Sequence, residues 1–221
     1  MIIRRAEKKD INECVPLIYS AGVPLFDYIY QQDEITAEKF IHQEFLSEYG
    51  YTSYRLHWVV EKDDKVIATV ACYGKNDLLK MDSGAIKNIL AIYRFRSPRV
   101  LARALHSASI ITKPNRSNLH IANFGVHSEF RSQGIGHLLL DHLKAFALQQ
   151  GCSILSLDVS CENPRGQSLY ERTGFKVIKE KQFKGIANAN YFDLHFFAYF
   201  LVQTCTNNAR FGFFNFLPSS G

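Results

Sequence analysis

The stretch LHIANFGVHSEFRSQGIGHLLLDHLKAFALQQG, residues 119–151, is soon followed by LSLDVSCENPRGQSLYERTGF, residues 155–175. Its apolar opening, Leu119 to Val126, predicts a strand, and the turn from Arg131 to Gly136 leads into an amphipathic helix. A second apolar strand and a short helix that carries Tyr170 come next. A helix that starts at a glycine-rich turn offers unpaired N–H groups and a positive dipole end to an anion. We therefore predict a pyrophosphate site at this turn, with the rest of the chain built around it.

The composition of the turn fits such a site. Glycines at 134 and 136 let a phosphate approach the backbone where side chains would collide, and the Arg131 guanidinium can bind the same phosphate. The turn is not a Walker motif, because no Gly-Lys-Ser/Thr follows. It also lacks the GxGxxG dinucleotide fingerprint with an acidic residue about twenty positions further on. Since a glycine-rich helix start is often only a tight turn, the surrounding residues must decide its role.

The whole chain has the composition of an ordinary soluble globular protein. It has 221 residues, of which 47% are hydrophobic and 21% charged. This length suits one sizeable core, so we predict a single domain over residues 1–221. The net charge of +5 is scattered rather than gathered in a stripe, which disfavours nucleic acid as a partner. A mild positive balance suits a ligand that carries several phosphates.

The cysteines and histidines do not predict a metal site. The five cysteines are far apart and include no CxxC pair, which favours reduced thiols in a cytoplasmic protein. His127, His137 and His142 have no carboxylate or cysteine at ligand spacing, so no metal is expected. The start of the chain shows no signal-peptide core. The apolar stretch near residues 191–202 is too short and too polar to span a bilayer, so we expect no membrane partner.

Strands and helices alternate along the remainder of the chain, which predicts a mixed α/β (α+β) fold with one mixed sheet. The predicted elements are strands at 1–6, 57–61, 65–73, 175–181 and 192–202, and helices that begin near Asp10 and Thr36. Gly22 and Pro24 interrupt the first helix. The aromatic segment after them, residues 25–33, is either core or a wall of an acceptor pocket.

Residues 75–117 form a helical insertion in the predicted fold. Helical periodicity covers about Ser83 to Tyr93 and Pro98 to Ile110, with Pro98 at a position that a helix start tolerates. Arginines at 94, 96, 99 and 103 predict a solvated basic face. The alternatives are that the insertion covers the acceptor site or forms a subunit contact in a homodimer. The aromatic C-terminal tail, residues 203–221, is apolar enough to dock on the body but ends in Pro-Ser-Ser-Gly.

The motif as a whole has a family resemblance. The run from Val126 to Leu139, followed after a strand by Asn163, Leu169-Tyr170 and Gly174-Phe175, closely resembles the GNAT superfamily of acetyl-CoA-dependent N-acetyltransferases. The motif covers about a quarter of the chain, and the order of the flanking elements extends the likeness over most of the rest. The resemblance implies a mostly antiparallel sheet, splayed between its fourth and fifth strands, with helices on both faces.

The resemblance also implies how acetyl-CoA is bound. Backbone N–H groups of the turn would hold the pyrophosphate, and the edge of the central strand would pair with the pantetheine arm. Asn163 matches the asparagine beside pantetheine, although it is equally a helix N-cap, and both can hold. The residues implied in cofactor binding are Phe124, Gly125, Val126, Arg131, Ser132, Gln133, Gly134, Ile135, Gly136, His137 and Asn163.

The resemblance assigns one catalytic residue and leaves a second open. Tyr170 stands where the family often uses a tyrosine to protonate the departing thiolate; the alternative is a packed aromatic. Some branches use a glutamate as base, and counting back six positions from Val126 gives His120 instead. A histidine suits this work, but His120 could also be a plain strand residue. Asn123 could hold a water.

In this family the splay of the two strands opens a slot for the pantetheine arm, and three further residues are candidates for chemistry near that slot. Glu129 and Asp158 are weaker candidates for the base, and Asp158 is expected to point away from the slot. Cys161 lies near the slot, but covalent catalysis would need a base partner, and none is identifiable.

The predicted function is transfer of an acetyl group from acetyl-CoA, as co-substrate, to a primary amine in a ternary complex. One alternative acceptor is a protein N-terminus or lysine, in which case the partner is a peptide rather than a small molecule. Another is that the chain is a non-catalytic acyl-CoA-binding module. The sequence does not identify the acceptor or the oligomeric state.

Overall fold

A single twisted sheet forms the centre of the computed structural model, which describes residues 1–186 and 189–197. Within these residues seven strands follow the order β1-β2-β3-β4-β5-β7-β6. The strands are β1 Ile2–Arg5, β2 His57–Lys62, β3 Lys65–Gly74, β4 Asn118–Val126, β5 Ile154–Ser160, β6 Lys176–Phe183 and β7 Ala189–Phe197. Neighbouring strands are antiparallel except for the parallel pair β4–β5. The predicted mixed, mostly antiparallel sheet is confirmed.

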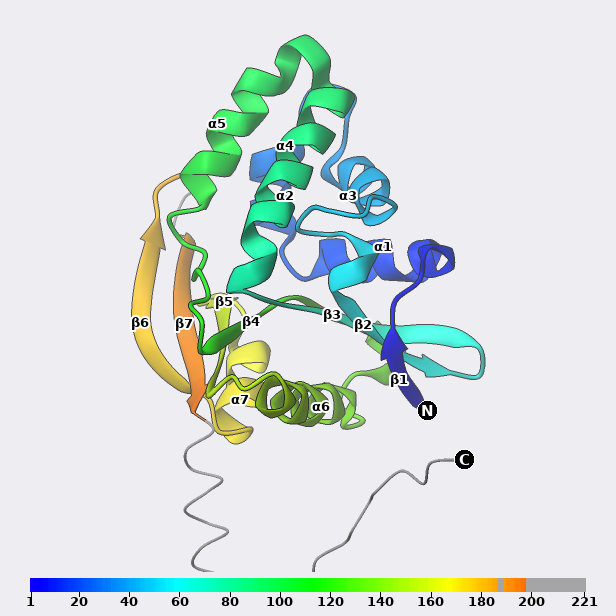
Figure 1. The fold of residues 1–221 in the computed structure, drawn as a ribbon, viewed down its shortest axis with the longest axis vertical. Coiled ribbons are helices and arrows are strands. Elements are labelled where there is room, and N and C mark those ends of the chain that lie inside the picture. The colour runs from blue at the N-terminus through cyan, green and yellow to red at the C-terminus, as the bar shows by residue number, and fades with distance from the viewer. Residues whose placement is uncertain (187–188, 198–221) are drawn as a thin grey trace, which may run out of the picture.

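Helices cover both faces of this sheet (Figure 1). The helices are α1 Ile11–Ser20, α2 Val23–Tyr30, α3 Ala37–Phe45, α4 Leu78–Tyr93, α5 Ser97–Ser107, α6 Ile135–Gln149 and α7 Pro164–Arg172. Helices α6 and α7 lie on one face, and α1 to α5 lie toward the other. None of the helices in the described ranges is long and apolar enough to cross a membrane.

Successive side chains of β4 point to opposite faces of the sheet. Leu119 and Ile121 point into the largest core cluster, together with the fully buried Leu139 and Leu143 of α6. The residue between them, His120, faces Tyr73 on the opposite side, at 5.4 Å between ring centroids. The strand therefore carries core residues toward α6 and polar residues toward α1 to α5.

Strands β4 and β5 separate halfway along their length. They pair from Asn118 and Ile154 up to Ile121 and Leu157, and not beyond, although β4 continues to Val126. A bulge at Asn123, where φ is 53°, shifts the register with β3 at this point. A bulge bends its strand and increases the local twist. The predicted splay between the fourth and fifth strands is thereby confirmed, and it leaves the end of β4 without a partner on that edge.

Three boundaries differ from the sequence prediction. The segment after Gly22 forms a helix of its own, α2, because Pro24 lies in its first turn, where the missing N–H costs nothing. Helix α4 starts at Leu78, five residues before the predicted start. Strand β7 starts at Ala189, before the predicted start. The end predicted for this strand and the aromatic tail, residues 203–221, lie outside the described residues.

Candidate active site

A cavity of about 1570 Å³ lies at the splay. At one end it reaches the turn before α6 and the first turns of α7. At the other end it is bounded by α2, α4 and α5, on the opposite face of the sheet. We call these the donor end and the acceptor end. A ligand that passes between β4 and β5 would therefore meet side chains from both faces of the sheet.

Twelve of the thirteen residues that the sequence marks as candidates line this cavity. They are His120, Phe124, Gly125, Val126, Arg131, Ser132, Gly134, Ile135, Gly136, His137, Asn163 and Tyr170. Gln133 does not line it, and its side-chain amide donates to the Glu129 carbonyl at 2.7 Å. The structure thus brings together residues that are up to fifty positions apart in the chain.

The three candidate glycines are required for different reasons. Gly134 has φ of 82°, the left-handed region, and a Cβ added there would meet no atom within 4 Å. A Cβ on Gly136 would lie 2.7 Å from the Leu169 side chain, so this glycine lets α7 pack on α6. A Cβ on Gly125 would lie 2.3 Å from the Leu17 carbonyl oxygen, where α1 crosses β4. Only Gly134 therefore leaves open space at the turn itself.

Guanidinium groups gather at the donor end. The Arg131 Nε donates to the Val126 carbonyl at 3.0 Å, which fixes its stem beside the turn. Arg165 donates to the Ser132 hydroxyl at 3.2 Å, and both Arg165 and Arg172 line the cavity. Sequence reasoning missed these two arginines of α7; the signal was the Asn-Pro-Arg that opens the helix. Such groups suit a phosphate ligand.

Asn163 has a structural role at the start of α7. Its Oδ1 accepts a hydrogen bond from the Gly166 backbone N–H at 2.9 Å, as an N-cap does. The residue also lines the cavity. The capping interpretation is confirmed, and the cavity lining leaves room for a second role beside a ligand.

Tyr170 lies on α7, and its side chain belongs to the core cluster that includes residues of β4, β5 and α6. Its side chain packs against Phe124 and Phe175, with ring centroids 6.3 and 6.0 Å away, and it is 9% exposed. Burial raises its pKa above the usual range, so the phenol keeps its proton at neutral pH. Within the described residues no hydrogen bond engages this hydroxyl, so it is available to a ligand in the cavity.

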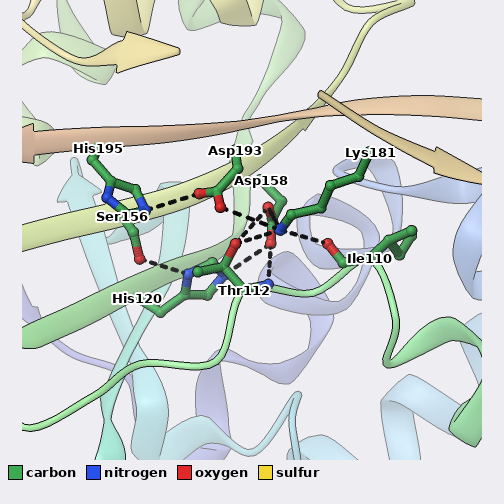
Figure 2. Close-up of polar contacts among 8 residues, drawn as sticks. All are labelled: Ile110, Thr112, His120, Ser156, Asp158, Lys181, Asp193 and His195. Carbon is green, nitrogen blue, oxygen red and sulfur yellow. Dashed lines mark hydrogen bonds and ion pairs between the residues drawn. The ribbon is translucent and has the colours of Figure 1, made fainter. Parts of the chain in front are cut away.

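His120 is buried in a polar cluster on the acceptor side of the sheet (Figure 2). It is 2% exposed; Nδ1 lies 3.0 Å from the Ser156 hydroxyl and Nε2 lies 3.6 Å from the Asp158 carboxylate. Burial lowers the pKa of His120 to about 4, although the charge of Asp158 acts in the other direction. The imidazole is therefore neutral at neutral pH.

Lys181 of β6 connects the carboxylates of this cluster. Its Nζ lies 2.8 Å from Asp158 and 3.5 Å from Asp193, which face each other across β5 and β7. It also donates to the Ile110 carbonyl at 3.1 Å, and the Thr112 N–H donates to Asp158 at 2.6 Å. The loop after α5 is thus fastened to the sheet. Asp158 lines the cavity, so the expectation that it points away is wrong.

The Asp193 carboxylate has a strongly lowered pKa. Burial alone would raise its pKa, but the hydrogen bond with His195 and the charge of Lys181 outweigh burial and lower the pKa to about 2. Asp193 is therefore charged at every physiological pH.

The arginines of the helical segment lie away from the cavity. Arg94, Arg96 and Arg99 are exposed, and Arg96 pairs with Asp33 at 2.9 Å. Arg103 donates to the Gln31 carbonyl at 2.9 Å. The predicted solvated basic face is confirmed for the exposed three, while the other sides of α4 and α5 contribute to the acceptor end.

Other candidate chemistry has little support in the geometry. No group of three His, Cys, Asp or Glu side chains that could hold a metal occurs in the described part of the chain. Cys161 is a partly buried free thiol, and burial raises its pKa, which keeps it protonated.

Comparison with known proteins identifies the family. Residues 24–175 match the model of the acetyltransferase (GNAT) family. Thialysine N-epsilon-acetyltransferase of Bos taurus is 32% identical over 87 residues, which are 39% of this chain and 51% of that protein. The match thus spans about half of the relative's length.

Solved structures share the fold at low identity. An acetyltransferase has a TM-score of 0.61 at 19% identity, over 90% of this chain and 100% of its own. An N-acetyltransferase from Staphylococcus aureus Mu50 has a TM-score of 0.62 at 16% identity, over 89% and 100%. The yncA structure from Salmonella typhimurium, solved with its cofactor acetyl-CoA, has 0.55 at 14%, over 90% and 94%. Because the family model covers well over half of the sequence, this chain belongs to the acetyltransferase (GNAT) family.

Proposed function

We propose that the protein transfers the acetyl group of acetyl-CoA to a primary amine by direct attack in a ternary complex. One observation carries this proposal: the splay of β4 and β5 joins the open glycine turn to the acceptor end in a single cavity. Two ligands can then be held at the same time, one entering from each face of the sheet. Such a geometry favours direct transfer over a covalent enzyme intermediate.

The donor end fits the three parts of acetyl-CoA. The turn and the N-terminus of α6 would bind the pyrophosphate, with Arg131 and Arg165 adding charge. The unpaired edge of β4 from Phe124 to Val126 would bind the pantetheine amides as an added strand. The thioester would then lie beside Tyr170, where β4 and β5 part.

The chemistry requires two proton movements. The amine nitrogen attacks the thioester carbonyl carbon, and a backbone N–H near Val126 stabilises the oxygen charge that forms. When the tetrahedral intermediate collapses, the carbon–sulfur bond breaks and the Tyr170 phenol donates its proton to the leaving thiolate. An acceptor that binds as an ammonium gives one proton to solvent before attack; the attacking nitrogen then loses a second, and neutral His120 is our candidate to take it, with Asp158 stabilising the imidazolium.

Release of free CoA thiol tests the transfer. Purified protein with acetyl-CoA should release thiol only when an amine is present, and mass spectrometry should find the N-acetylated amine in equal amount. If calorimetry detects acetyl-CoA binding while no amine supports thiol release, the protein is a non-catalytic acyl-CoA-binding module instead.

The role of His120 is tested by the pH dependence of kcat/KM. With a pKa of about 4, His120 stays unprotonated above about pH 5, so its own titration limits the rate only below that value. His120→Gln should lower kcat roughly 100-fold and remove the acidic limb near pH 4. An unchanged kcat would assign the base to another group, and Ser156→Ala is the control for the packing of the ring.

A further inference from the structure

The acceptor end has a chemical character that the donor end lacks. Its walls come from α2, α4, α5 and the loop after α5, and most of the side chains there are aliphatic or aromatic. They include Leu25, Phe26, Ile86, Leu101, Leu105 and Ile111. The charged side chains of this end are Asp82, Asp158 and Lys113, whereas Arg131, Arg165 and Arg172 line the donor end. The donor end therefore suits a ligand that carries negative charge, and the acceptor end suits a ligand with an apolar body.

Two of these apolar side chains remain open to solvent. Leu105 of α5 is 77% exposed and Ile86 of α4 is 48% exposed, although both line the cavity. An exposed apolar patch at the rim of a pocket is typical of a site that contacts an apolar ligand. A ligand body that covers Leu105 and Ile86 would remove their exposed apolar surface from water, which favours binding.

One carboxylate at the acceptor end is free to bind a cation. Asp158 is already engaged by Lys181 and Thr112. Asp82 of α4 lines the cavity, and its recorded contact in the described residues is the hydrogen bond that it accepts from the Tyr51 hydroxyl; no ion pair involves it. The Tyr51 carbonyl in turn accepts from the Asn123 side chain at 3.0 Å. Tyr51 thus links Asp82 of α4 to Asn123 at the bulge of β4.

We propose that the acceptor is a monocationic primary amine on an apolar body, with the ammonium drawn in by Asp82 and the body resting on Ile86, Leu101 and Leu105. This inference rests on the proposed acetyl transfer and specifies its substrate class. Asp82, the carboxylate of these walls without an ion pair, matches one ammonium, whereas a polyamine would bring further charges toward Lys113 and into aliphatic walls that offer them no partner. A small alkyl or arylalkyl amine and a peptide with an apolar N-terminal residue share this chemistry.

Kinetics with a panel of matched amines tests the substrate class. The probes are hexylamine and phenethylamine, ethanolamine as a polar monocation, spermidine as a polycation, and a short peptide with an N-terminal leucine. We expect kcat/KM for hexylamine or phenethylamine to exceed that for ethanolamine and spermidine by about 100-fold. The peptide arm distinguishes a small amine from a peptide N-terminus.

Three variants assign the selectivity to residues. Leu105→Ser should reduce kcat/KM for hexylamine about tenfold and leave ethanolamine unchanged. Leu79→Ser is the matched control, because Leu79 is 83% exposed on α4 but does not line the cavity. Asp82→Asn keeps the hydrogen bond from Tyr51 and should raise KM for every amine about tenfold, with acetyl-CoA affinity unchanged.

The outcomes separate this inference from the proposed function. Turnover that is highest on apolar monoamines and falls in Leu105→Ser but not in Leu79→Ser supports the inference. Turnover that is highest on spermidine or ethanolamine overturns it and leaves acetyl transfer intact. Bound acetyl-CoA without turnover on any probe overturns the proposed function, and this inference with it.

Discussion

The donor end and the acceptor end of the cavity are assembled in different ways. The donor end comes from one continuous stretch, in which strand, turn and helix follow one another from Leu119 to Gln149, with α7 shortly after. The acceptor end comes from α2, α4 and α5, and α3 and two strands separate α2 from α4 along the chain. A site made by local backbone geometry has a sequence signature, whereas a site made by the packing of distant helices has none.

The largest effect is expected for a variant that disrupts acetyl-CoA binding at the donor end and leaves the acceptor end intact. Gly134→Asp tolerates the left-handed backbone fairly well but places a carboxylate in the open space at the turn. Repulsion of the pyrophosphate should weaken acetyl-CoA binding about a thousandfold, as a like-charge contact costs several kcal/mol. Calorimetric titration with acetyl-CoA measures this loss.

Gly151→Asp is the matched control for that variant. Gly151 has φ of 70° and equally open space, but it lies at the other end of α6, outside the cavity lining. This variant bears the same backbone strain and should bind acetyl-CoA normally. Equal affinities in the two variants would refute a phosphate site at the turn.

Acid should lower the free energy of unfolding, because two histidines are buried on the face of the sheet toward α1 to α5. Burial lowers the pKa of His57 and of His120 to about 4, while an unfolded histidine titrates near 6.5. Between these values the unfolded chain binds protons that the folded chain does not. Stability is therefore complete above pH 6.5 and falls as the pH drops toward 4, by roughly 3 kcal/mol for each histidine.

Denaturant unfolding across this pH window measures the loss. His57→Gln should reduce the slope of stability against pH by about half, since one of the two buried histidines is gone. His127→Gln, at an exposed position, controls for the substitution itself. Stability that stays flat from pH 7 to 4 would contradict the buried neutral state of both rings.

Removing the Tyr170 hydroxyl should affect the chemical step and not donor binding. Tyr170→Phe keeps the packing against Phe124 and Phe175 but has no proton to give. We expect kcat to fall on the order of 100-fold, with the affinity for acetyl-CoA nearly unchanged. Tyr54→Phe, outside the cavity lining, should leave kcat alone. An unaltered kcat in Tyr170→Phe would remove this residue from the mechanism.

The smallest effect concerns a charge at the rim of the donor end. Arg165 is exposed, so its contact with a phosphate is screened by solvent and salt. Arg165→Ala should weaken acetyl-CoA binding about fivefold at low salt and less at high salt. Arg165→Lys, which keeps the charge, should recover part of the loss. A deficit that does not depend on salt would indicate a structural role for Arg165.

The sequence predicts the donor end better than the acceptor end, for the same reason. Gly134 could be identified because a left-handed turn before a helix restricts residue type locally, and Tyr170 because it stands in the motif that resembles the family. Asp82 could not be identified, since a single aspartate on a helix belongs to no motif. Only the packing of α4 in the folded structure brings this side chain to the cavity. Gly22 and Pro24 interrupt the first helix as predicted, but the start of a second helix at Pro24 could not be predicted, because a proline is compatible with both a break and a helix start.

The aromatic segment after Gly22 illustrates why alternatives stayed open. Ile29 and Tyr30 are buried in the core and also line the cavity, as do Leu25 and Phe26, which pack only partly against the core. Helical periodicity places both sets on one short helix. Apolar residue types alone cannot distinguish a core from a pocket wall, because both exclude water.

Hydrogen–deuterium exchange with and without acetyl-CoA tests the division of the cavity most directly. The account predicts slower exchange of backbone amides at 124–126 and 131–137, where N–H groups would bind pantetheine and pyrophosphate. It predicts no change in α2, α4 and α5 until an amine is added. Slower exchange confined to those three helices, with the turn unaffected, would contradict the account.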